Sequence, residues 1–131
     1  MKQLALAIII WTFSVSTFAV SPYAYIVSPT HGEVVTSPFK VVFGLAGVGV
    51  APAGVQLDRT GHHHLLIDTD LPDLTKPIPA DANHQHFGAG QTETTVELPP
   101  GEHTLQLLLG DWSHIPHNPA VMSKKITITV K

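Results

Sequence analysis

The chain has 131 residues, no cysteine, nine histidines and a formal net charge of −3 at pH 7 with the histidines neutral. This length suits one small domain, and the lack of cysteine excludes disulfides, thiolate ligands, a cysteine nucleophile and a cysteine-linked lipid anchor. No basic stretch accompanies the acidic balance, so nucleic acid is not an expected partner.

Residues 1–19 are predicted to be a signal peptide. Lys2 precedes a largely apolar run at residues 4–15, and small residues follow up to Ala19. The run is short for a membrane-spanning helix and no basic flank follows it, which favours cleavage after Ala19 over retention as an anchor. Residues 20–131 would then form a single periplasmic or secreted domain that is not inserted in the membrane.

The remaining chain reads as a series of short strands. Eleven prolines and ten glycines divide the sequence into segments in which apolar and polar residues alternate, a pattern typical of strands. Strands are expected at residues 23–28, 39–45, 61–68, 91–98, 102–109 and 122–130. The sequence therefore predicts an all-β domain, a small immunoglobulin-like β-sandwich of about six to seven antiparallel strands.

The segment from Thr69 to Gly90 is the longest without a clear strand pattern. It holds three prolines and ends in the sequence His-Gln-His-Phe-Gly-Ala-Gly. Loops of about twenty residues are uncommon in compact domains and are often functional. We expect the seventh strand, if the domain has one, to lie within this segment.

Three consecutive histidines open the strand at residues 61–68. Side chains alternate across a strand, so His63 shares a face with Leu65 and Ile67 and is predicted to be a buried structural histidine. His62 and His64 point to the opposite face, with Cα atoms about 7 Å apart, and two imidazoles so placed can bind one metal ion. Isolated pairs of this kind are also common as solvated surface residues.

The predicted topology brings three groups of metal-binding side chains to one end of the sandwich. One group opens the strand 61–68, one precedes the strand 91–98, and one follows the strand 102–109; strands that alternate in direction bring these points together. The candidate metal ligands are His62, His64, His84, His86, Asp111, His114 and His117. Among them His62 and His64 are the expected core ligands, His86 and His114 complete the set, and the other three are alternates or supporting residues.

Two further histidines are expected at the opposite end. His31 lies between the first two strands, and His103 follows the turn Pro99-Pro100-Gly101. Immunoglobulin-like domains often carry at that corner a tyrosine that bonds to the backbone, so His103 is predicted to be structural. Trp112, beside Asp111, leaves three alternatives open: it covers the site, binds a partner, or packs at the edge of the core.

Imidazole with carboxylate is a donor set that suits copper(II) or zinc. The single methionine after residue 19, Met122, argues against a copper(I) thioether site. We therefore expect copper(II) or zinc as the bound ion, and we expect no organic cofactor.

Several stretches resemble a known bacterial family. They are GHHHLLID, HQHFGAGQTETTVELPPGEHTLQLLLGDWSHIPHNP and SKKITITV. They resemble the exported domain of unknown function numbered 4399, from about Ser28 to the end of the chain. The resemblance implies a small exported β domain and no established activity. The residues that it points to, without giving any of them a role, are His62, His63, His64, Asp68, His84, His86, Gly88, Gln91, Thr92, Glu93, His103, Asp111 and His114.

The leading hypothesis is an exported histidine-rich module that binds a divalent transition metal, with the ion and another periplasmic protein as its expected partners. One alternative is a metal-free module that binds a partner or responds to pH, because histidines gain charge near pH 6. The other is a copper- or zinc-dependent enzyme, such as one with superoxide-dismutase-like activity. The enzyme is less favoured because the chain has neither a serine in a nucleophile elbow nor a cysteine.

Overall fold

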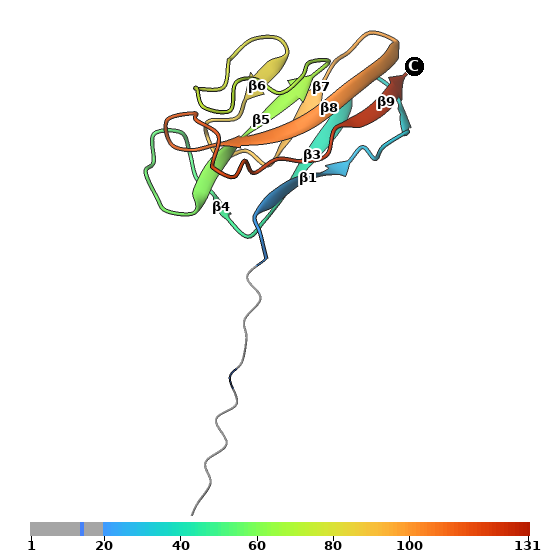
Figure 1. The fold of residues 1–131 in the computed structure, drawn as a ribbon. Coiled ribbons are helices and arrows are strands. Elements are labelled where there is room, and N and C mark those ends of the chain that lie inside the picture. Colours follow the sequence, from blue (N-terminus) through green and yellow to red (C-terminus); the bar gives the residue numbers. More distant parts are fainter. Residues whose placement is uncertain (1–13, 15–19) are drawn as a thin grey trace, which may run out of the picture.

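The computed structural model describes residues 14 and 20–131, and residues 20–131 fold into two β-sheets that pack face to face (Figure 1). The strands are β1 (Tyr23–Ser28), β2 (Val34–Val35), β3 (Phe39–Ala46), β4 (Gly49–Val50), β5 (Thr60–Ile67), β6 (His84–His86), β7 (Glu93–Val96), β8 (Gly101–Gly110) and β9 (Ile126–Val130). The predicted signal peptide falls, apart from Ser14, outside the described residues and stays a prediction. In the part of the chain that the structure describes, no helix is long and apolar enough to cross a membrane.

The strand order is that of an immunoglobulin-like sandwich, which confirms the predicted fold. The smaller sheet has the order β1-β3-β7, and the larger sheet has the order β2-β9-β8-β5-β4 with β6 also paired to β5. The six longer strands occupy the six predicted segments, with ends that differ by a few residues. Strands β2 and β4, of two residues each, were not predicted, and they pair in parallel with β9 and β5.

The long segment after β5 does contain a strand. Strand β6 runs antiparallel to β5 and places His86 opposite His64 and His84 opposite Leu66. It therefore extends the larger sheet next to the histidine-bearing strand. The prolines before it restrict the rest of the segment to irregular structure, because proline lacks the N–H that a sheet requires.

The main core lies between the two sheets. The inward faces of the longer strands contribute apolar side chains with almost no exposed surface, among them Val41, Leu65, Leu105, Leu107 and Ile128. Each such side chain stabilises the fold by about 1.5–3 kcal/mol through removal of apolar surface from water. Phe43 packs against the ring of His63 at a centroid distance of 5.1 Å, so the His63 ring belongs to this core.

A second, smaller core covers the outer face of the larger sheet. Leu66 of β5, Leu108 of β8 and Ile78 of the segment before β6 are buried together. The backbone N–H of Ile78 also donates to the carbonyl oxygen of His114 at 2.8 Å. Strand β5 is thus covered on both faces, and this is why all residues from Gly61 to Ile67 are buried.

We expect Leu107→Ala to lower the free energy of unfolding by about 2–5 kcal/mol, because it opens a cavity between the sheets. Urea unfolding followed by tryptophan fluorescence measures this change. Leu57→Ala is the control, since Leu57 is 61% exposed and its loss should change stability by no more than about 0.5 kcal/mol. Equal effects of the two substitutions would contradict this placement of the core.

His103 ties the start of β8 to the end of β5. Its Nδ1 lies 2.6 Å from Oδ2 of Asp68, and its Nε2 lies 2.9 Å from the carbonyl oxygen of Pro99. Both ring nitrogens therefore face acceptors, which suits the protonated ring. The hydrogen bond to Asp68 is the main cause of a raised pKa of His103, with a smaller contribution from Pro99.

This pair predicts a pH-dependent stability. Because the pKa of His103 is raised on folding, its contribution is fully present below the ordinary pKa of about 6.5 and is lost as the pH rises through the raised value. Asp68→Asn keeps an acceptor for the backbone N–H of Thr104 but removes the charge. We expect the destabilisation by Asp68→Asn, measured by urea unfolding, to be larger at pH 6 than at pH 9. A destabilisation that is the same at both pH values would contradict the assignment.

Candidate metal centre

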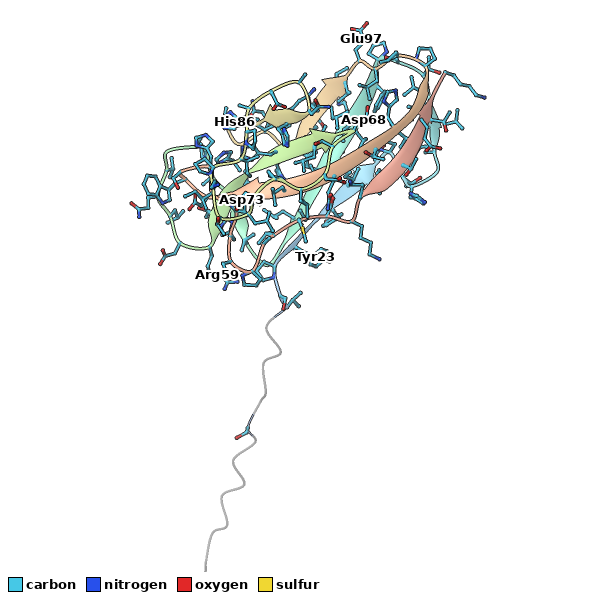
Figure 2. All side chains as sticks on the ribbon, turned by 45° about the horizontal axis from the view of Figure 1, so that its top comes forward. Tyr23, Arg59, Asp68, Asp73, His86 and Glu97 are labelled. Carbon is cyan, nitrogen blue, oxygen red and sulfur yellow. The ribbon has the colours of Figure 1, made fainter. Side chains whose placement is uncertain are left out.

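Four histidines from three distant segments meet at one end of the larger sheet. His62 and His64 lie on β5, His86 ends β6, and His114 lies in the turn after β8. We call these four residues the histidine cluster. Figure 2 shows His86 nearer the end of the sandwich that carries Arg59, whereas Asp68 lies nearer the end that carries Glu97.

The register of the larger sheet produces this convergence. His64 is directly opposite His86 in the pairing of β5 with β6, and His62 is opposite Gly110 at the end of β8. The chain then turns back after Gly110, which brings His114 over the start of β5. His62 and His64 are two residues apart and so share the face that the other two histidines approach.

Five of the six ring pairs lie at nearly the same distance, and the pair His64–His114 is wider. The centroid distances are 4.8 Å for His62–His64, 4.9 Å for His62–His86, 4.9 Å for His62–His114, 5.1 Å for His64–His86, 4.8 Å for His86–His114 and 6.1 Å for His64–His114. One ligand nitrogen from each of His62, His86 and His114 lies within 4.8 Å of the other two. These three form the tightest group, and His64 lies beside it.

Among the described residues, His86 and His114 make a direct ring-to-ring contact at hydrogen-bond distance. Their Nε2 atoms are 3.2 Å apart. Two nitrogens that each bind one tetrahedral ion at 2.0–2.1 Å are about 3.4 Å apart, so the separation is close to that of a shared ion. It is also the length of a hydrogen bond in which one neutral ring donates to the other.

His62 and His64 are both fully buried, and His62 is the one with two unpartnered ring nitrogens among the described residues. It has 0% exposed surface, and neither ring nitrogen has a hydrogen-bond partner among the described residues. The Nδ1 atom of His64, which is 1% exposed, also lacks a partner there. A buried polar atom without a partner costs about 1–3 kcal/mol, so this arrangement is unfavourable unless something else binds these nitrogens.

Burial keeps these rings neutral at pH 7. It is the largest cause of the lowered pKa of His62, to about 4, and of His64, to about 3, and the neighbouring histidines lower both further. Burial and then His114 also lower the pKa of His86. A neutral imidazole has a free lone pair, which is the form that binds a metal ion.

Asp111 shapes the turn that carries His114. Its Oδ1 accepts hydrogen bonds from the backbone N–H and hydroxyl of Ser113 and from the backbone N–H of Ile115, at 2.8, 2.8 and 3.0 Å. Burial raises the pKa of Asp111, but these bonds outweigh it, and the net pKa is lowered. With this support the backbone of His114 adopts a φ of 71°, which is uncommon for a residue other than glycine. Asp111 therefore supports the histidine cluster and is not part of it.

The two remaining candidate ligands have other partners. The Nδ1 of His84 lies 2.8 Å from Oδ1 of Asp81, and the Nε2 of His117 lies 3.0 Å from the carbonyl oxygen of Thr60. Sequence spacing left His84, Asp111 and His117 as alternate ligands or supporting residues, because it gives residue type and approximate place but not the direction of a side chain in a loop. The Asp-x-Ser pattern at residues 111–113 is a turn signal that could have marked Asp111 as structural.

The two structural histidines stand apart from the site. His63 points into the main core, and burial lowers its pKa to about 4. His103 contacts Asp68 through its ring Nδ1 at the opposite end, and His31 accepts a hydrogen bond from the backbone N–H of Thr127 there.

Trp112 is 44% exposed, and its carbonyl oxygen accepts a hydrogen bond from the backbone N–H of Gly54.

The chain matches a known family over most of its described length. The sequence model of the family described as Domain of unknown function (DUF4399) matches residues 41–131 of the chain. The chain belongs to this family. The matched residues include the whole histidine cluster. No curated protein matches the chain.

Among solved structures, the chain is similar to one titled "Structures of Clostridium thermocellum CbhA fibronectin(III)-like modules". The identity is 12% and the TM-score is 0.42. The similarity covers 85% of this chain and 46% of the other, so the chain spans less than half the length of that structure.

The Asp111 turn gives a test of how His114 is held. Asp111→Ala removes the acceptor of three hydrogen bonds, and Asp111→Asn keeps a side-chain oxygen at the same place. We expect Asp111→Ala to lower the free energy of unfolding by about 1–3 kcal/mol and to shift the His114 ring resonances in NMR spectra. Asp111→Asn should change both much less. If alanine and asparagine behave alike, the carboxylate does not support the turn in this way.

Proposed function

We propose that this domain binds one divalent transition metal ion, copper(II) or zinc, at the histidine cluster. His62, His86 and His114 would supply three nitrogens, and His64 is the nearest further ligand. The observation that carries the proposal is the buried ring of His62, whose unpartnered nitrogens adjoin two other imidazoles. An ion at this position would compensate the cost of burying these groups.

The donors of the histidine cluster are all imidazole nitrogens, without carboxylate, thiolate or thioether. Such a set suits copper(II) and zinc, and copper(II) generally binds a given nitrogen site more tightly than zinc does. His62 and His64 lie on a central strand that is covered on both faces, whereas His86 is exposed to solvent. We propose that the ion enters past His86 and reaches the two buried rings.

The direct test is metal uptake by the purified domain. We expect the wild-type protein to bind about one equivalent of copper(II) or zinc in isothermal titration calorimetry with parallel metal analysis. His62→Ala should weaken binding by at least about 100-fold, since even supporting residues around metal sites are worth about 10–100-fold. His84→Ala is the matched control, because His84 bonds to Asp81 outside the histidine cluster. Absence of uptake by the wild type, or equal losses in both variants, would refute the proposal.

A metal-free module remains the second candidate. Its support is the 3.2 Å contact of His86 with His114, which has the length of a hydrogen bond between two imidazole rings. NMR spectra of the imidazole nitrogens distinguish the two functions. Stoichiometric metal would shift the ring resonances of at least three histidines under the first function and of none under the second.

We also propose that the domain acts in the periplasm after removal of residues 1–19. The support is the short apolar run with its basic start and the small residues before Val20. We expect protein isolated from the periplasm of a Gram-negative host to begin at Val20, as determined by intact-mass analysis. Retention of the full mass in the membrane fraction would show that the run serves as an anchor.

A further inference from the structure

Gly88 lies two residues after His86, at the point where the chain leaves β6. Its backbone does not have the positive φ that favours glycine, in contrast to Gly90 close by, where φ is 84°. Its carbonyl oxygen accepts a hydrogen bond from the backbone N–H of Ala53 at 2.8 Å, which any residue could provide. The backbone conformation therefore does not explain why position 88 is glycine.

Space does explain it. A Cβ atom at Gly88 would overlap Cε1 of His86 and would lie only 2.7 Å from Nε2 of the same ring. This Nε2 is the atom that lies 3.2 Å from Nε2 of His114. The His86 imidazole thus occupies the volume that any other residue at position 88 would fill.

We infer that Gly88 is a positioning residue for the metal ligand His86, because the absent side chain leaves the space in which the His86 ring meets the histidine cluster. This inference rests on the proposed metal site. It adds that the identity of residue 88 decides whether the ring nitrogen of His86 is available to bind the ion.

A methyl group at position 88 should displace the ring and leave the fold intact. The clash is with the end of an exposed side chain, which can rotate away from the site. The next contact would be Cβ of Ala53 at 3.3 Å, which requires a shift of only a few tenths of an ångström. The effect should therefore appear in ligand geometry and metal affinity, and hardly in stability.

Gly110 has a related arrangement that is less suited to a test. A Cβ there would lie 2.9 Å from Cε1 of His64 but also 3.3 Å from the Cα and carbonyl carbon of His114. Substitution would press on the backbone of the Asp111 turn as well as on a ring. Gly88 is the position where ring placement can be changed by itself.

A double-mutant cycle tests the inference. Copper(II) and zinc are titrated separately into the wild type, Gly88→Ala, His86→Ala and the double variant. We expect Gly88→Ala to weaken binding by a factor within about threefold of that of His86→Ala, and the double variant to bind no more weakly than His86→Ala. Effects that multiply in the double variant, or wild-type affinity in Gly88→Ala, would overturn the inference.

Gly49→Ala is the matched control. Gly49 also lacks a positive φ, and a Cβ there would meet only Cγ2 of Thr60 at 3.4 Å, an ordinary contact, and the carbonyl oxygen of Arg59 at 3.9 Å. We expect it to bind metal as the wild type does. The metal-free proteins should melt within a few degrees of one another, so that a loss of affinity in Gly88→Ala cannot be attributed to unfolding.

A second measurement does not depend on metal. In the metal-free wild type the rings of His86 and His114 should show a nuclear Overhauser effect, because their centroids are 4.8 Å apart. The effect should disappear in Gly88→Ala and persist in Gly49→Ala. Its persistence in Gly88→Ala would refute the positioning role even if no metal binds. Absence of binding by the wild type together with loss of the effect in Gly88→Ala would refute only the proposed metal function.

Discussion

The structure depends on the burial of strand β5 from both sides. Its inner face packs into the core between the sheets, and its outer face is covered by the segment that contains Ile78 and, near the start of the strand, by the turn that carries His114. A strand in this position is normally apolar throughout, as the sequence Leu65-Leu66-Ile67 is. Its first half instead holds three histidines with almost no exposed surface. The fold therefore keeps three polar rings in a place where they cost stability, and the function that we propose accounts for two of them.

The burial of these rings also determines their chemistry. Water is excluded around His62 and His64, so the charged form is disfavoured and the neutral form persists well below pH 7. A solvent-exposed pair of histidines would compete with protons for a metal ion in mildly acidic surroundings. The buried pair does so much less, because its nitrogens are already deprotonated before an ion arrives.

The sequence predicts much of this architecture, and the reason is alternation. Patterns in which apolar and polar residues alternate identify the six longer strands. They also separate His63 from His62 and His64 correctly, because successive side chains of a strand point to opposite faces of the sheet. Chain direction then predicts the meeting of His62, His86 and His114.

The alternating pattern cannot show that the outer face of β5 is covered, because the covering segment has no regular period. It also cannot tell which of His84, Asp111 and His117 would be a ligand and which a supporting residue, because their directions are set by local turns and hydrogen bonds. Gly88 lacks a signal of this kind altogether, since a glycine required for space looks like any other glycine near a turn.

The members of the histidine cluster are far apart in sequence and differ in how firmly they are held. Strand β5 is paired on both sides, whereas β6 has three residues and pairs, among the described strands, only with β5. An ion bound to His62, His86 and His114 would join the rigid centre of the sheet to a short edge strand and to a turn. It would act as a removable cross-link that closes two long loops of chain, at residues 62–86 and 86–114.

Local opening of this end of the sandwich would then depend on the concentration of free metal through ordinary mass action. Metal supply would thus control the rigidity of the surface around Trp112 and His86, while the opposite end, held by His103 and Asp68, would respond to pH instead.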